Sequence, residues 1–134
     1  MRDKSDIFIL SSAAVFALAI ILAITIPIMQ NPLRRPNPSV RKYVLSVTPI
    51  GMSMDDARAA IIEQKWGIAY ESIEYGYLDS RLPAGQRIIG EKHIQADIGT
   101  YRAMLIFPMS VTVYWGFDGD GKLIDVCVVK ILSA

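Results

Sequence analysis

Few side chains in this sequence could do chemistry, and the most conspicuous run of them is Asp118-Gly-Asp120-Gly-Lys122. Oxygen ligands at alternating positions are typical of a calcium loop, which also needs a glycine at its sixth position and a glutamate at its twelfth. This chain has Leu123 and Val129 at those two positions, and Lys122 adds a positive charge at the fifth. We therefore interpret the run as a hairpin turn, for which Asp-Gly is a strong signal, and predict no metal site.

The single histidine and the single cysteine are the next candidates for chemistry. If residues 91–97 form a strand, His93 shares one face with Glu91, Gln95 and Asp97, and a hydrolase could use such a histidine with Glu91 or Asp97 as a general base. A polar, solvated strand face explains the same pattern, and we adopt that interpretation. Cys127 lies between two valines with no base nearby, which predicts a buried, unreactive thiol. We expect no catalytic residue and no cofactor, with a hydrolase using His93 as the alternative.

Tyrosine is the remaining side chain that could bind a partner, because tyrosine and tryptophan are enriched at binding surfaces. Four tyrosines fall in or beside predicted strands: Tyr70, Tyr75, Tyr77 and Tyr114. We hypothesise that they form an interaction surface. Cross-strand packing in a small antiparallel sheet uses the same residues and stays open as the alternative.

The elements that position these residues begin, after a short polar N-terminus at 1–6, with an apolar segment at 7–29. It has 23 residues, of which 19 are hydrophobic and none is charged. A helix of this length spans about 34 Å, enough to cross a hydrocarbon core of about 30 Å. The run is longer than the apolar region of a signal peptide, and it ends in bulky residues where cleavage needs small ones. We predict an uncleaved, single-pass transmembrane helix, the alternatives being a buried core helix and a cleaved signal peptide.

Basic residues flank the predicted span on both sides. Two precede it and four follow it, namely Arg2 and Lys4, then Arg34, Arg35, Arg41 and Lys42. The positive-inside rule slightly favours a cytoplasmic C-terminal side, by a margin too narrow to decide, so both orientations stay open. The four residues after the span could contact anionic lipid headgroups, although charge beside a span is also ordinary.

The remainder of the chain is predicted to be a linker and one domain. Residues 30–39 contain three prolines, which fix the backbone and favour an extended, semi-rigid spacer. Residues 40–134 are then a small α+β domain with one helix at about 54–65. Ser53 followed by Asp56 resembles a capping box at the start of that helix.

An antiparallel sheet of about four to five strands is predicted for the rest of the domain. The extended segments are 40–47, 68–78 with a phase break near Ser72, 87–96, 101–107, 110–117 and 122–132. Pro108 separates the fourth from the fifth, because proline interrupts a strand ladder. Both faces of the last segment are apolar, which predicts a central strand.

Composition excludes several classes of protein. Lys and Arg number 14 against 13 Asp and Glu, so the chain is not a strongly basic nucleic-acid binder. One cysteine excludes a disulfide scaffold, and one histidine leaves little for zinc. The charge is unevenly distributed, because residues 1–42 hold six basic and two acidic side chains, whereas 43–134 hold eight and eleven.

Three stretches together resemble a group of small, uncharacterised, membrane-anchored proteins of Gram-positive bacteria: TPIGMSMDDA at 48–57, IGEKHIQADIGTYR at 89–102 and SVTVYWGFDGDGKLIDV at 110–126. More distantly, the Gly-Met-Ser before a helix and the late Phe-Asp-x-x-Gly-Lys-Leu hairpin resemble BamE (SmpA/OmlA) and β-lactamase-inhibitor-like domains. The chain has no lipobox cysteine after its apolar segment, so lipid anchoring of the BamE type does not carry over. The resemblance implies a small α+β domain held outside the cytoplasm, and no catalytic residues.

The sequence therefore predicts a plasma-membrane protein whose C-terminal domain is extracytoplasmic and non-catalytic. Its expected partners are the lipid bilayer and a protein or envelope polymer, with no nucleic acid. The alternative is a cytoplasm-facing, membrane-tethered regulator or an immunity-like inhibitor of a partner enzyme.

Overall fold

The computed structural model describes residues 11–23, 31–104 and 106–133, and the chain divides into two compact units, Met1–Asn31 and Pro32–Ala134. In the first unit, residues 11–23 are helical and their hydrophobic side chains are exposed. Among the described residues, no helix is both long and apolar enough to cross a membrane. Residues 1–10 and 24–30, which include the ends of the predicted span, lie outside the described residues.

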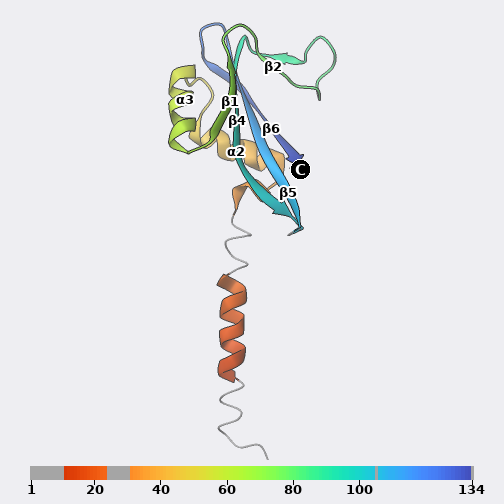
Figure 1. Ribbon diagram of the computed structural model, residues 1–134. Helices are drawn as coiled ribbons and strands as arrows, with labels where there is room; N and C mark the ends of the chain where they lie inside the picture. The colour runs from red at the N-terminus through yellow and green to blue at the C-terminus, as the bar shows by residue number, and fades with distance from the viewer. Residues whose placement is uncertain (1–10, 24–30, 105, 134) are drawn as a thin grey trace, which may run out of the picture. The chain divides into compact units, whose positions relative to one another are not determined.

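The second unit has the predicted α+β fold, built on a four-stranded antiparallel sheet (Figure 1). The strand order is β1-β4-β5-β6, and the strands span Gly67–Ser72, Lys92–Ala103, Phe107–Phe117 and Leu123–Leu132. A separate pair joins β2 (Tyr77–Leu78) to β3 (Ile88–Ile89). The helices are η1 (Pro32–Arg34), α2 (Asn37–Val47) and α3 (Met54–Glu63). In Figure 1, α3 and β2 lie on opposite sides of the sheet.

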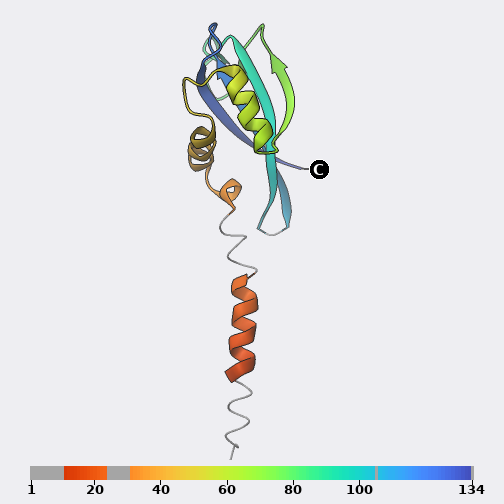
Figure 2. The same cartoon turned by 90° about the vertical axis from the view of Figure 1, so that its left-hand side faces the viewer.

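Helix α3 forms where the capping signal predicts it and covers one face of the sheet (Figure 2). The Ser53 side chain accepts a hydrogen bond from the Asp56 amide at 3.2 Å. Acidic residues in the first turn complement the helix dipole. Ala57 and Ile61 are fully buried against the sheet. The helix therefore buries one apolar stripe, as its sequence period predicts.

Trp115 is the largest fully buried side chain of the core. Its indole Nε1 donates a hydrogen bond to Thr48 Oγ1 at 2.9 Å, and that hydroxyl donates in turn to the Val44 carbonyl at 3.0 Å. The Trp66 ring lies 6.1 Å from Trp115, and Tyr43 packs edge-on against Trp66. The end of α2 is thus tied to the middle of β5.

The predicted extended conformation of residues 40–47 is wrong, because this segment belongs to helix α2. Val40 and Val44, one turn apart, are fully buried, so tertiary packing outweighs the strand preference of valine. The prediction of an extended linker at 30–39 is also wrong, because Pro32–Arg34 form η1, with Leu33 buried, and α2 begins at Asn37. Pro38 lies in the first turn of α2, where a missing amide costs no hydrogen bond. The described part of the domain therefore has two α-helices where one was predicted.

Strand β6 lies at an edge of the sheet, which corrects the prediction that it is central. Side chains of α2 cover its free edge. Arg41 Nε donates to the Val126 carbonyl at 3.1 Å, and the Asn37 amide donates to the Val128 carbonyl at 3.4 Å. The residues of β6 are apolar on both faces because the β2–β3 segment covers the second face near Cys127, as described below.

The turn predicted at Asp118 is confirmed. Asp118 Oδ1 accepts hydrogen bonds from the amides of Asp120 and Lys122, at 3.0 and 2.9 Å.

The predicted strand at 101–107 is not one strand, since β4 ends at Ala103 and β5 begins at Phe107. Pro108 stands within β5. The Pro108 carbonyl accepts a hydrogen bond from the Ser133 amide on the β6 side. The Pro108 nitrogen, which has no hydrogen to donate, lies on the same side, so no hydrogen bond between β5 and β4 is lost.

The hydrogen bond from Trp115 to Thr48 gives a stability prediction. Thr48→Val keeps the shape of the side chain but leaves the buried indole N–H without an acceptor, so the free energy of unfolding should fall by about 1–3 kcal/mol. Equilibrium urea unfolding, followed by tryptophan fluorescence, measures this. Thr100→Val, at an exposed position of β4, is the matched control, and an equal loss in both variants would contradict the assigned role.

Candidate functional site

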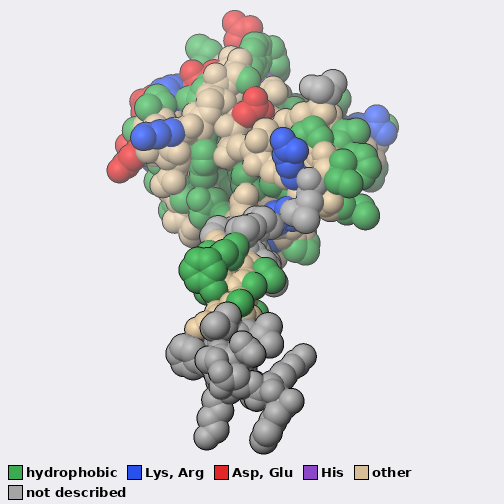
Figure 3. Space-filling model, turned by 60° about the horizontal axis from the view of Figure 1, so that its bottom comes forward, with side chains coloured by type: hydrophobic (Ala, Val, Ile, Leu, Met, Phe, Trp, Pro, Cys, Tyr) green, Lys and Arg blue, Asp and Glu red, His purple; other side chains and the backbone are tan. Residues whose placement is uncertain are grey.

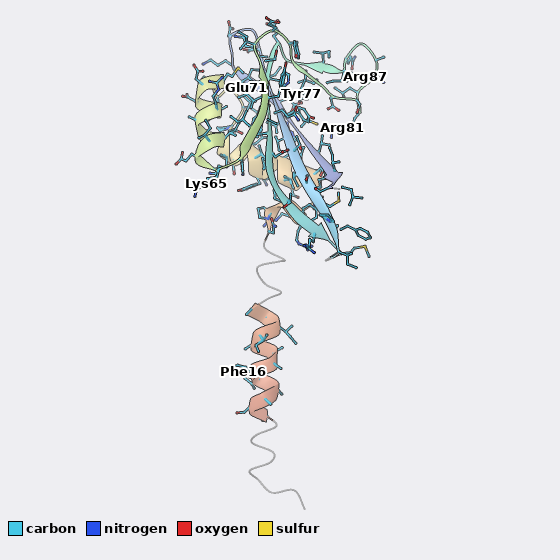
Figure 4. All side chains as sticks on the ribbon, viewed as in Figure 1. Phe16, Lys65, Glu71, Tyr77, Arg81 and Arg87 are labelled. Atoms are coloured by element: carbon cyan, nitrogen blue, oxygen red, sulfur yellow. The ribbon has the colours of Figure 1, made fainter. Side chains whose placement is uncertain are left out.

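The face of the sheet opposite α3 carries the predicted interaction residues. Strand pairing sets Tyr70, Gln95, Tyr114 and Cys127 in one row across the four strands. His93 lies in the neighbouring row, opposite Ser72 of β1. Figure 4 shows Tyr77 and Arg81, from the segment that covers part of this face, on the side of the sheet away from α3.

A turn stabilised by Ser72 brings the chain back over this face. Ser72 Oγ accepts hydrogen bonds from the amides of Glu74 and Tyr75, at 3.2 and 3.3 Å. The turn places the Tyr75 carbonyl 2.9 Å from His93 Nδ1. The predicted phase break near Ser72 is therefore the end of β1, and the irregular pairing lies earlier, between Ile68 and Tyr70.

Tyr70, Tyr75 and His93 form one aromatic cluster. The His93 ring centroid lies 5.5 Å from that of Tyr70 and 5.6 Å from that of Tyr75. The hydroxyls of Tyr70 and Tyr75 are hydrogen-bonded to each other, and this bond raises the pKa of Tyr70. His93 is only 5% exposed, which corrects the prediction of a solvated strand face. The two tyrosines are half-exposed, so the cluster has a buried base and an accessible rim.

Tyr77 packs on the same face beside that cluster. Its ring lies 5.7 Å from Tyr114 and rests on Gly116, where a Cβ would come within 2.8 Å of the Tyr77 ring. Tyr77 is 2% exposed, and its hydroxyl has no hydrogen-bond partner among the described residues. Burial raises the pKa of Tyr77, and the nearby carboxylates of Asp125 and Asp79 add to the effect. Tyr77 is thus a packing residue of this face.

Between these elements lies a hollow of about 520 Å³, large enough for a small ligand or a few residues of a polymer chain. Its lining is mostly aromatic and aliphatic, with one amide, and comprises Tyr70, Tyr75, Gly76, Tyr77, Leu78, Ile88, His93, Gln95 and Tyr114. Aromatic faces supply contact area, and the tyrosine hydroxyls and the Gln95 amide supply hydrogen bonds. The structure therefore brings all four predicted tyrosines to one hollow, although only three of them keep accessible surface.

Arg81 links the loop between β2 and β3 to Cys127 of β6, and an ion pair within the loop orients it. Arg81 binds the Asp79 carboxylate through Nε and Nη2, at 2.9 and 2.8 Å, and these bonds lower the pKa of Asp79. Arg81 Nη2 also lies 3.0 Å from Cys127 Sγ. Burial raises the pKa of the Cys127 thiol, which is buried as predicted.

The geometry around His93 does not assemble the alternative hydrolase site. Within residues 11–23, 31–104 and 106–133, His93 has no hydrogen bond to a carboxylate, and Asp97 instead accepts from Thr112 Oγ1 at 2.8 Å. The Glu91 side chain lies against the backbone at Gly119. In the same part of the chain, no three His, Cys, Asp or Glu side chains are placed to hold a metal ion.

The four basic residues predicted to contact lipid headgroups have different surroundings. Arg34 donates to the Arg102 carbonyl at 2.6 Å and lies over the Tyr101 ring. Arg41 pairs with Asp125 at 2.7 Å, so its charge is partly neutralised. The Arg35 carbonyl accepts from Lys130, and Lys42 is exposed on α2.

Sequence reasoning missed three features of this site: the burial of His93, the aliphatic walls Leu78 and Ile88, and the anchoring of the covering loop by Arg81. The alternation along 91–97 did place His93 and Gln95 on one face. A serine whose hydroxyl accepts from amides two and three residues later is a turn signal. Ser72 stands in this position relative to Glu74 and Tyr75, so it could have located the chain reversal.

Comparison of the chain with family models, with curated proteins and with solved structures finds no match. The resemblance to membrane-anchored and BamE-like proteins therefore stays a prediction.

The unpartnered hydroxyl of Tyr77 gives a second stability prediction. Tyr77→Phe removes a buried polar atom without removing the ring, so the free energy of unfolding should stay constant or rise by about 1 kcal/mol. Thermal unfolding of this variant, beside Tyr114→Phe, measures the change. A loss of stability confined to Tyr77→Phe would contradict packing as the role of Tyr77.

Proposed function

We propose that this chain is a single-pass membrane protein whose α+β domain binds a protein or an envelope polymer and catalyses no reaction. The observation that most supports this proposal is the aromatic hollow on the open face of the sheet, where Tyr70, Tyr75 and Tyr114 lie around Gln95. In this proposal the hollow, with its accessible aromatic rim, is the binding site. The apolar segment 7–29 is the proposed membrane anchor, supported by its length and lack of charge.

The chemistry of the hollow suits an extended chain better than an ion. Its walls are rings and aliphatic side chains, and Leu78 and Ile88 remain largely exposed at its edge. Such surfaces gain affinity by burying aromatic and aliphatic area, with a few polar groups fixing orientation. His93 contributes from below by holding the Tyr75 carbonyl, which keeps the rim in place.

Site-specific crosslinking tests the hollow as the binding site. A photoreactive phenylalanine analogue at Leu78, in the full chain in its native membrane, should give a defined adduct. The same analogue at Ile62, equally exposed on α3 at 59%, should give none. Adding Tyr75→Ala should reduce the Leu78 adduct about tenfold, because losing one aromatic anchor typically costs that much affinity. Equal adducts at both positions, or no effect of Tyr75→Ala, would contradict the proposal.

Orientation separates the extracytoplasmic domain from its alternative, a cytoplasm-facing regulator or immunity-like inhibitor. Alkaline phosphatase needs disulfides, which form outside the cytoplasm, so a fusion after Ala134 should be active. A cytosolic reporter such as β-galactosidase at the same site should be inactive. The reverse pair of activities would favour the alternative, to which the four basic residues after the predicted span already give slight support.

A further inference from the structure

The turn between β4 and β5 has an unusual composition. Short hairpin turns normally place Gly, Asn or Asp where the backbone needs a positive φ, but Ala103 pairs with Phe107 across a three-residue turn, and residues 103–107 read AMLIF. Met104 adopts a left-handed conformation with φ of 51°, which a residue with a side chain rarely adopts, and it is 81% exposed. Ile106 is 70% exposed, and Phe107 is half-exposed. Neither turn geometry nor packing within the domain explains these apolar side chains.

The neighbouring end of β6 extends the same apolar surface. Register pairing sets Met109 of β5 opposite Leu132, and both Ile131 and Leu132 are largely exposed. We call Met104, Ile106, Phe107, Ile131 and Leu132 the hairpin end. Large exposed apolar groups gathered at one place on a small domain mark a contact surface.

Cations surround the hairpin end. The Arg34 guanidinium lies 5.7 Å and the Lys130 ammonium 5.2 Å from the centre of the Tyr101 ring. Lys130 donates to the Arg35 carbonyl, and Arg34 to the Arg102 carbonyl. These contacts bring four basic residues, from η1 and the residue after it, from β4 and from β6, to one end of the sheet.

Within the described residues, none of these four basic side chains has an ion pair with an acidic residue. The segments that build this end, residues 31–40, 98–112 and 128–133, contain four Lys and Arg but no Asp or Glu, whereas Arg41, farther along α2, is paired with Asp125. Figure 3 brings this side of the domain forward, and Lys and Arg side chains there are interspersed with hydrophobic ones, whereas Asp and Glu lie at the top and left of the domain and, in one case, near its middle. An apolar tip with a cationic rim is complementary to an anionic lipid surface.

We propose that the hairpin end inserts into the interface of an anionic lipid bilayer while Arg34, Arg35, Arg102 and Lys130 contact its headgroups. Tyr101 lies among these cations, and tyrosine is enriched at that depth of a membrane. The site differs from the tyrosine hollow and extends the headgroup contacts predicted from sequence to two residues outside the N-terminal flank, Arg102 and Lys130.

The short length of chain between the proposed anchor and the domain favours a bilayer, rather than a second copy of the chain, as the partner of the hairpin end. This step rests on the proposed anchor. Residue 29 ends the predicted span, and Pro32 begins η1, so at most about 10 Å of chain separates them. Element η1 packs against β4, with the Leu33 side chain 2.8 Å from where a Cβ on Gly99 would stand. The domain is thus tethered through the same end that carries the apolar tip and the cations.

Depth-dependent fluorescence quenching tests the proposal on the full chain in vesicles. A polarity-sensitive dye is attached to Met104→Cys in a Cys127→Ser background, and brominated lipids serve as the quencher. In vesicles of phosphatidylcholine and phosphatidylglycerol in equal amounts, the dye should be quenched and its emission should shift to shorter wavelength. In phosphatidylcholine alone, quenching should be largely lost. Equal quenching, or none, in both vesicles would overturn the proposal.

Variants separate the apolar and the cationic contributions. Ile106→Ser with Phe107→Ser should abolish quenching in the anionic vesicles, whereas Ile62→Ser, at a similarly exposed isoleucine on α3, should not. Arg102→Gln with Lys130→Gln should lower the ratio of docked to undocked domain about 25-fold, at about fivefold per charge. Retention of full quenching in either double variant would contradict the assignment.

A second label keeps this test independent of the proposed anchor. Phe16→Cys carrying the same dye should be quenched in both kinds of vesicle if residues 7–29 insert. Quenching at 104 that depends on lipid charge supports the hairpin proposal whatever the label at 16 reports. Energy transfer between labelled chains that rises with protein density, without lipid quenching at 104, would indicate a second copy as the occupant and overturn the proposal.

Discussion

The burial of Trp115 is the constraint on which the rest of the domain depends. An indole that is fully buried must find an acceptor for its N–H, and Thr48 provides it at 2.9 Å. Thr48 is also bonded to Val44, so the same hydroxyl fixes the end of α2 against the middle of β5. Trp66 and Tyr43 then close the core beside it. With α2 held there, its Arg41 and Asn37 reach the free edge of β6 and protect that edge from pairing with other chains.

Different kinds of interaction cover the two faces of the sheet. Helix α3 covers the core face through an ordinary apolar stripe. The other face is covered by a short segment held by particular contacts: the Ser72 turn, the carbonyl of Tyr75 on His93, and the contact of Arg81 with Cys127. Gly116 makes room for the Tyr77 ring, which a Cβ at that position would displace. Because this second layer is partial, a hollow remains beside it, with Tyr70 and Tyr75 at its rim.

The domain thus carries two surfaces of different chemistry within the part of the chain that the structure describes. The tyrosine hollow is aromatic and lies on the open face of the sheet. The hairpin end is aliphatic and cationic and lies at one end of the same strands, β4 and β5. Both depend on the length of β4 and β5, since these two strands extend from the hollow, at His93 and Tyr114, to the turn at Met104. A domain held at a membrane by one surface would leave the other free to bind.

The sequence by itself determined the α+β class, helix α3, the Asp118 turn and the shared face of His93 and Gln95, because each follows from local chemistry or a short period. Only the tertiary structure decided that 40–47 is a helix, since Val40 and Val44 have strand propensity that burial outweighs. Only the tertiary structure placed β6 at an edge, because a strand with two apolar faces has the same sequence pattern whether another strand or a loop covers it. It also gathered the four tyrosines and the cations at the hairpin end, which come from segments distant in the chain. Local signals fix local conformation, whereas sites formed by distant segments depend on how the strands pair.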